Sequence, residues 1–105
     1  MYASMHLRLA AIASDDSDRE EQLGVACPIK LGLYLSGGHE VQNCWLADGE
    51  NSLDDASIDV MVGEPPVLRV IAIAHIVMVR VAYPSTADEE HAQAAAALGQ
   101  TRGQG

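Results

Sequence analysis

The chain contains 105 residues, which is enough for one domain and too few for two. Hydrophobic residues make up 49% of it, so it has the apolar material for a core that a disordered acidic tail lacks. Its formal net charge of -9, from 15 acidic and 6 basic residues, argues against direct binding to nucleic-acid phosphates and to anionic membrane surfaces.

The N-terminal segment alternates between apolar and other residues. Apolar side chains at positions 5, 7, 9, 11 and 13 show the period of two that is typical of a strand with one buried face, so we predict a strand there. Residues 14–18 are all Ser or Asp, which favour loops and helix caps. Residues 15–21 carry five acids and one arginine, and we expect either a loop or a short helix.

The clearest alternation covers residues 23–35. It predicts one long strand, or two strands broken near Pro28, because proline cannot donate a hydrogen bond to a neighbouring strand. Residues 36–39 then form a glycine-containing turn, and residues 40–46 form the next strand. A three-residue loop would place the apolar side chains of both strands on one face. We therefore predict a register that pairs Leu35 with Val41 and Leu31 with Trp45.

A second acidic stretch, residues 48–59, contains five acids and no base. It leads into a predicted strand over residues 58–62 and a proline-containing connection over residues 63–66. Residues 67–83 form the most apolar run, although Arg69, His75 and Arg80 interrupt it too often for a membrane-spanning helix. Because both faces of this run are apolar, we predict a central strand that is bent or split near residues 72–74.

The C-terminal segment predicts a helix. Thr86 and Glu89 have the spacing of a capping box, and alanines with high helix propensity follow them. Gly99 is placed to end the helix, so we expect residues 100–105 to be a flexible tail. Together these elements predict a single α+β domain over residues 1–99. It would be a mostly antiparallel sheet of about five or six strands, with the C-terminal helix packed on one face.

The cysteines and histidines suggest no particular chemistry. Cys27 and Cys44 form no disulfide framework, which favours a reducing, cytoplasmic setting. Together with His39 and His75 they lack the spacing of a zinc site or of a known nucleophilic motif. We expect no catalytic residues, no metal and no cofactor. We also expect Cys27 to be a buried thiol and Cys44 a half-exposed one.

The acidic residues are the candidate functional groups. If the two acidic stretches lie on the same side of the domain, they form one surface that attracts a basic partner. The predicted partner-binding residues are Asp15, Asp16, Asp18, Glu20, Glu21, Asp48, Glu50, Asp54 and Asp55.

These features favour a small acidic, non-enzymatic binding or regulatory protein. It could be an inhibitor that engages a basic protein surface, for example that of a nucleic-acid-binding protein, through its acidic loops. The alternative is a small enzyme or ligand-binding domain with a pocket on the open face of the sheet. Because one helix would leave much of the sheet uncovered, a homodimer through that uncovered face is also expected.

Overall fold

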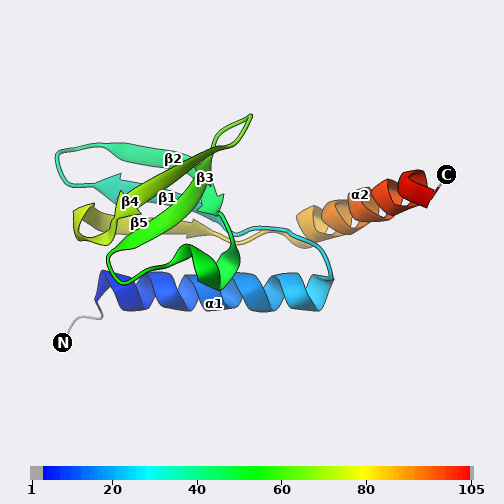
Figure 1. The fold of residues 1–105 in the computed structure, drawn as a ribbon, viewed down its shortest axis with the longest axis horizontal. Helices are drawn as coiled ribbons and strands as arrows, with labels where there is room; N and C mark the ends of the chain where they lie inside the picture. Colours follow the sequence, from blue (N-terminus) through cyan, green and yellow to red (C-terminus); the bar gives the residue numbers. More distant parts are fainter. Residues whose placement is uncertain (1–3, 105) are drawn as a thin grey trace.

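The computed structural model describes residues 4–104, and the side chains of residues 4–99. It contains two α-helices, five strands and two short 3-10 helices, η1 and η2 (Figure 1). In chain order these are α1 (Met5–Leu23), β1 (Lys30–Leu35), β2 (Glu40–Leu46), η1 (Gly49–Ser52), β3 (Ser57–Val62), β4 (Val67–Ala72), η2 (Ile73–His75), β5 (Ile76–Ala82) and α2 (Thr86–Gln104).

The five strands form one antiparallel sheet in the order β4-β3-β2-β1-β5. The predicted α+β class is therefore confirmed. The strands at the two edges, β4 and β5, are joined only by η2. The four peptide units from Ala72 to Ile76 span at most about 14 Å, whereas the edges of a flat five-stranded sheet lie about 19 Å apart. The sheet must therefore curl, as Figure 1 shows.

The N-terminal segment is a helix, so the predicted strand over residues 5–13 is wrong. The hydroxyl of Ser4 caps this helix by accepting a hydrogen bond from the Leu7 amide at 3.2 Å. Gly24 ends the helix in the left-handed conformation, with φ of 76°. The buried side chains follow helical spacing, because one face packs on the curled sheet; they are Leu9, Ile12, Ala13 and Asp16.

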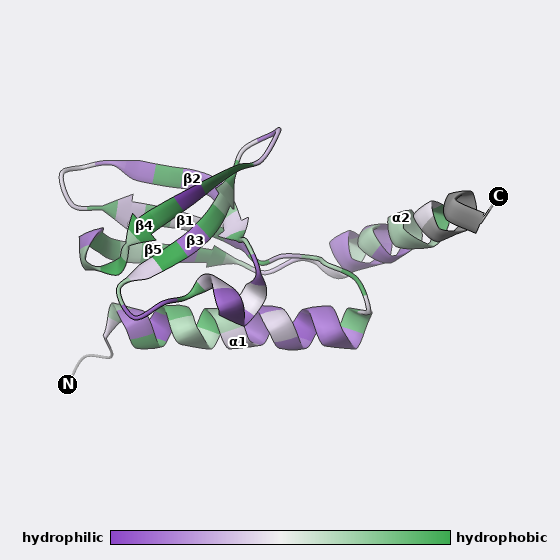
Figure 2. Cartoon of the chain, in the orientation of Figure 1, coloured by the Kyte–Doolittle hydropathy of each residue, from purple (hydrophilic) through white to green (hydrophobic). Residues whose placement is uncertain are grey.

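The core lies between α1 and the concave side of the sheet. It is entirely aliphatic apart from one cysteine, in keeping with the absence of Phe from the sequence. Its buried members are Leu9, Ile12, Ala13, Ile29, Leu31, Leu33, Val41, Cys44, Leu46, Ile58, Val60, Ile71, Ile73 and Ile76. Figure 2 shows the hydrophilic C-terminal half of α1 and the largely hydrophobic β4.

A C-terminal helix follows the strands as predicted, but its predicted packing on one face of the sheet is wrong. Figure 1 shows α2 extending away from the sheet, and no residue of α2 whose side chain the structure describes belongs to the core. The position on the sheet is occupied by α1, whose apolar face is larger than the alanine-rich surface of α2.

The capping of α2 is displaced by one residue from the prediction. Ser85 is the capping residue, because its hydroxyl accepts from the Asp88 amide at 3.1 Å while its own amide donates to the Asp88 carboxylate at 3.0 Å. The helix continues to Gln104, so Gly99 does not end it. The flexibility of residues 100–105 stays a prediction.

The β1–β2 hairpin differs from the predicted register. Leu31 pairs with Cys44 and Leu33 with Val41, and the register shifts between these pairs. Asn43 lies at this irregularity with φ of 54°, so one extra residue on β2 reverses the side-chain alternation. Cys44 is consequently buried in the core, whereas Cys27 is half-buried, so the expected half-exposure of Cys44 and the expected burial of Cys27 are both wrong.

The remaining strand predictions are partly confirmed. The strand expected over residues 23–35 begins only at Lys30, after Pro28, because the preceding residues end α1 and form a connection. The run over residues 67–83 is split near residues 72–74 as predicted, by η2. Its two halves are not central, however, because they form the two edges of the sheet.

No helix within residues 4–104 combines the length and the apolar character that a membrane-spanning helix requires.

Candidate acidic binding surface

The two acidic stretches meet in space, because η1 packs beside the C-terminal half of α1. The Glu50 amide donates to the Ser17 hydroxyl at 3.0 Å. Farther along, the His6 Nε2 atom lies 3.1 Å from the carbonyl oxygen of Asp54, near the start of the helix. Residues 48–54 therefore run antiparallel to α1. We call the surface formed by residues 48–54 and the adjacent part of α1 the acidic surface.

Gly49 sets how closely the two segments approach. Its φ is 49°, and a Cβ atom at this position would collide with the Ser17 hydroxyl. Glycine is therefore required both by the backbone conformation and by the contact. The buried Ser52 hydroxyl accepts from the Asp48 amide at 2.6 Å and fixes the start of η1.

A small pocket of about 160 Å³ lies where the two segments and β2 come together. Glu20 from α1 and Asp48 from the η1 side both line it, and Trp45 lines it as well. Two carboxylates and an aromatic surface are groups that bind a lysine or arginine side chain. The Trp45 ring already holds one such cation, because Lys30 Nζ lies 4.0 Å from its centroid.

Most of the predicted partner-binding residues are accessible. Exposed residues are Asp18, Glu20, Glu21, Asp48, Glu50, Asp54 and Asp55. The acidic surface therefore exposes carboxylates from both stretches. Both must be exposed if the two stretches are to bind one partner together.

Asp16 is one of two exceptions, because its side chain is buried. It accepts a hydrogen bond from the Ile29 amide at 3.0 Å and so holds the connection between α1 and β1 against the helix. Asp16 therefore has a structural role, and it is also among the residues that line the pocket.

Asp15 is half-buried and points to the other side of α1, toward the start of α2. A hydrogen bond with Asp15 raises the pKa of the Tyr83 hydroxyl. Arg19 lies 5.6 Å from the centroid of the Tyr83 ring and forms an ion pair with Glu89 at 3.2 Å. Asp15, one of the predicted partner-binding residues, thus interacts with Tyr83 of the same chain.

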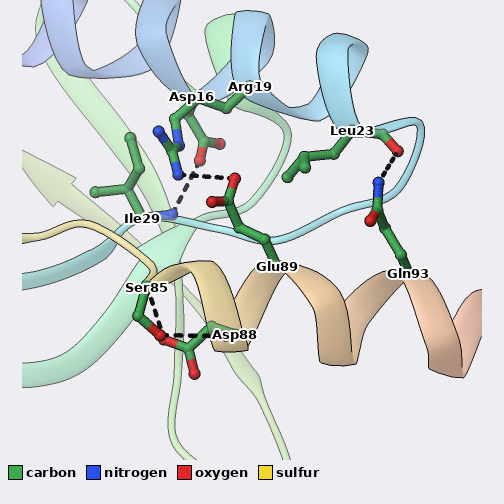
Figure 3. Close-up of polar contacts among 8 residues, drawn as sticks. All are labelled: Asp16, Arg19, Leu23, Ile29, Ser85, Asp88, Glu89 and Gln93. Carbon is green, nitrogen blue, oxygen red and sulfur yellow. Dashed lines mark hydrogen bonds and ion pairs between the residues drawn. The ribbon is translucent and has the colours of Figure 1, made fainter.

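Figure 3 shows how these contacts join α2 to the end of α1. Glu89 of α2 reaches Arg19, and the Gln93 side-chain amide donates to the Leu23 carbonyl at 3.1 Å. Both contacts involve the first part of α2, so this part is attached to α1 while the rest of the helix extends beyond it.

A larger groove of about 350 Å³ lies between the connection after α1 and the first turns of α2. Cys27, Tyr83 and His91 are among its lining residues. Burial raises the pKa of the Cys27 thiol, and the nearby Glu89 and Asp88 raise it further. Cys27 is therefore the opposite of an activated nucleophile, which needs a lowered pKa.

The other thiol and the two histidines named in the sequence serve local structure. Burial raises the pKa of Cys44 to about 11, and its Sγ donates to the Leu31 carbonyl at 3.2 Å. His75 Nδ1 lies 3.2 Å from the Ser36 hydroxyl, and His39 accepts from the Leu35 amide through its backbone carbonyl. Among the residues that the structure describes, no three His, Cys, Asp or Glu side chains come together as metal ligands.

The outer face of the sheet carries a shallow hollow of about 150 Å³ on β1, β2 and β5. It is the place where the predicted alternative, an enzyme or ligand-binding domain, would have its pocket. Gly32, Gln42 and Arg80 are among its lining residues, and this lining includes no carboxylate, thiol or imidazole. The hollow therefore offers no acid–base pair.

Comparison of the chain with protein-family descriptions, with curated proteins and with solved structures gives no match.

The contact between Ser17 and η1 and the cluster around Arg19 were not predicted from the sequence. Ser17 is an ordinary serine within an acidic stretch, and no spacing links it to Gly49, which is 32 positions away. Their contact depends on where α1 packs. Only a prediction that residues 5–23 form a helix could therefore have indicated that Ser17 lies beside η1.

Asp16 leads to a prediction about stability. Asp16→Ala removes the acceptor for the buried Ile29 amide and should lower the free energy of unfolding by about 1–3 kcal/mol. Asp16→Asn retains an acceptor oxygen in the same place, so it should cost clearly less. Urea denaturation of both variants at pH 7 measures the difference. Equal losses in the two variants would show that the hydrogen bond to Ile29 is unimportant.

A comparison of the unmodified protein with D16N tests the charge of Asp16. Burial raises the pKa of Asp16, and it does so despite the hydrogen bond from the Ile29 amide. The charged form is thus less favourable in the folded than in the unfolded protein. The stability of the unmodified protein relative to D16N should be highest below about pH 4 and should fall as the pH rises through the pKa of folded Asp16. A relative stability that increases with pH would contradict this assignment.

Proposed function

We propose that this chain is an acidic protein-binding module that engages basic side chains of a partner protein through its acidic surface. The observation that carries the proposal is the packing of η1 against α1, which joins carboxylates from two separate stretches into one region. Complementary charge of this kind steers a partner of opposite charge and fixes its orientation.

The pocket between the two segments gives the proposal a specific contact. Glu20 and Asp48 both line it, so a lysine or arginine side chain of the partner would find one carboxylate from each stretch. A partner with a row of basic residues, such as a nucleic-acid-binding protein, has the required chemistry. In that case the domain would act as a regulator or inhibitor by covering the phosphate-binding residues of the partner.

A peptide-binding experiment tests this function. The probe is a fluorescently labelled peptide rich in lysine and arginine, and anisotropy is measured at low salt and at 150 mM salt. We expect D48K/E50K to weaken binding at least tenfold, because it reverses two charges beside the pocket. The matched control is E40K/E90K, which changes the net charge by the same amount at two exposed positions away from the acidic surface.

The control decides between a defined surface and net charge. A much smaller loss for E40K/E90K than for D48K/E50K supports the acidic surface. Equal losses would mean that the peptide responds only to the total charge, and the proposal would then be wrong. Far-ultraviolet circular dichroism of both variants checks that they remain folded.

A further inference from the structure

The pocket in the acidic surface contains a third carboxylate that the proposed function does not use. Asp16 and Glu20 both line it, and their spacing of four residues places them on one face of α1. Asp48 lines it from the segment that leads into η1. The other lining residues are uncharged, and Trp45 and Leu46 are among them. The pocket therefore combines three acids from two segments of the chain with a partly apolar lining.

One oxygen of the buried Asp16 carboxylate has no partner. Asp16 is only 8% exposed, and its Oδ1 atom accepts a hydrogen bond from the Ile29 amide at 3.0 Å (Figure 3). No other described residue donates a hydrogen bond to Asp16 or forms an ion pair with it. An ionised carboxylate accepts through both oxygens, and a buried acceptor without a donor costs free energy. Asp16 thus holds Ile29 with one oxygen and keeps the other available to a ligand in the pocket.

The pocket does not supply its own cation. Among the described residues, none of those that line it is Lys, Arg or His. Arg19 is paired with Glu89, and Lys30 lies over the Trp45 ring; neither lines the pocket. The three carboxylates are therefore available to a cation that another molecule brings.

The arrangement of the acids favours an extended cation over a point charge. In the part of the chain that the structure describes, no three acidic, His or Cys side chains come together as metal ligands. A lysine ammonium is also compact and is strongly hydrated, whereas an arginine guanidinium is planar, carries five N–H donors and is more weakly hydrated. A guanidinium can therefore reach carboxylates that lie apart while its flat faces contact the apolar lining.

The volume of the pocket limits the ligand to the end of one side chain. The pocket holds about 160 Å³, whereas sites for whole small-molecule ligands hold about 300–1,000 Å³. A single side chain that enters from a peptide outside the pocket is small enough to fit.

We propose that the pocket is specific for one arginine side chain of the partner, whose guanidinium donates hydrogen bonds to Asp16 Oδ2 and to the carboxylates of Glu20 and Asp48. The inference rests on the proposed function and names the residue type that the acidic surface recognises. It also separates the pocket from the rest of that surface, which attracts lysine and arginine alike. Asp16 then has two roles, one for each of its oxygens.

Two labelled peptides test the specificity: a lysine peptide, and the same peptide with its central lysine replaced by arginine. In an anisotropy titration at 150 mM salt, which screens the attraction between distant charges, we expect the unmodified protein to bind the arginine-containing peptide at least tenfold more tightly. Both peptides carry the same charge, so the ratio of their dissociation constants does not report on net charge.

Matched variants locate the preference. Asp16→Asn keeps an acceptor for the Ile29 amide but removes the charge, and Glu20→Gln makes the equivalent change at an exposed residue. Each should reduce the ratio to about threefold or less. Asp18→Asn and Glu21→Gln make the same chemical changes at exposed residues of α1 that do not line the pocket, and they should keep the full ratio.

The outcomes separate this inference from the proposed function. Equal affinity for the two peptides would overturn the arginine pocket and leave the proposed function intact, whereas failure to bind either peptide would overturn both. A preference that survives in D16N and E20Q, or that D18N and E21Q reduce equally, places the arginine elsewhere and contradicts the proposal. If D16N does not fold, E20Q decides, with E21Q as its control.

Discussion

Replacing Leu9 with alanine should lower the free energy of unfolding by about 2–5 kcal/mol. The Leu9 side chain is 0% exposed and packs in the core between α1 and the sheet. Removing most of it leaves a cavity in an aliphatic core, where the surrounding side chains have little freedom to close the space. Urea denaturation followed by circular dichroism measures the loss.

Leu7→Ala is the matched control, because it makes the same chemical change two residues away. Leu7 is 63% exposed, so the expected change in stability is within about 0.5 kcal/mol. In a strand, residues 7 and 9 would lie on the same face, whereas in a helix they point in different directions. Similar losses for the two variants would therefore contradict the helix and support a strand.

The apolar pattern of residues 5–13 is the part of the sequence that led to a wrong prediction. Residues 5–13 fit a period of two, but Leu9, Ile12 and Ala13 also fit helical spacing. Alternation counts Leu7 as a core residue, and the structure shows that it is not. Ser4 before the segment and Gly24 after it are helix-capping residues, and they were the local signals that favoured the helix.

The sheet could be predicted where one face is buried and the alternation is regular. Leu31 and Leu33 of β1 are buried as the pattern requires, and the glycines after β1 form the turn. The register of β2 could not be predicted, because it depends on the irregularity at Asn43. A single extra residue exchanges the two faces of a strand. Asparagine adopts the left-handed conformation more readily than most residues, but this tendency alone does not place an extra residue at position 43.

The edge strands show a second limit of prediction from sequence periodicity. An apolar run over residues 67–83 is expected for a strand covered on both faces, but it is equally expected for an edge that a second molecule covers. Sequence periodicity does not distinguish the two, because it records which side chains are apolar and not what lies beside them.

The sequence predicts the charge of the acidic surface but not its shape. The two stretches were identified from the sequence, and most of their residues are exposed. Asp16 was indistinguishable from its neighbours, although it is largely buried and accepts a hydrogen bond from the Ile29 amide. What joins the stretches is the close approach of Gly49 to Ser17, so this contact is where the surface is most sensitive to substitution.

Gly49→Ala should lower the free energy of unfolding by about 2–5 kcal/mol. A left-handed backbone at a residue with a Cβ costs about 1–2 kcal/mol, and overpacking against Ser17 adds about 1–3 kcal/mol. The Ser17 hydroxyl can turn away from the new methyl group only by giving up its hydrogen bond with the Glu50 amide. We expect η1 to move away from α1, so the variant should also bind the basic peptide more weakly.

Gly63→Ala separates the two contributions. Gly63 also has a positive φ, of 80°, but a Cβ atom there would have no neighbour within 4 Å. Its expected loss is therefore the backbone cost alone, with no effect on peptide binding. Ser17→Ala combined with Gly49→Ala should recover part of the overpacking loss, because it removes the atom that collides. If Gly49→Ala and Gly63→Ala have equal effects on stability and binding, the close approach of η1 to α1 does not hold the acidic surface together.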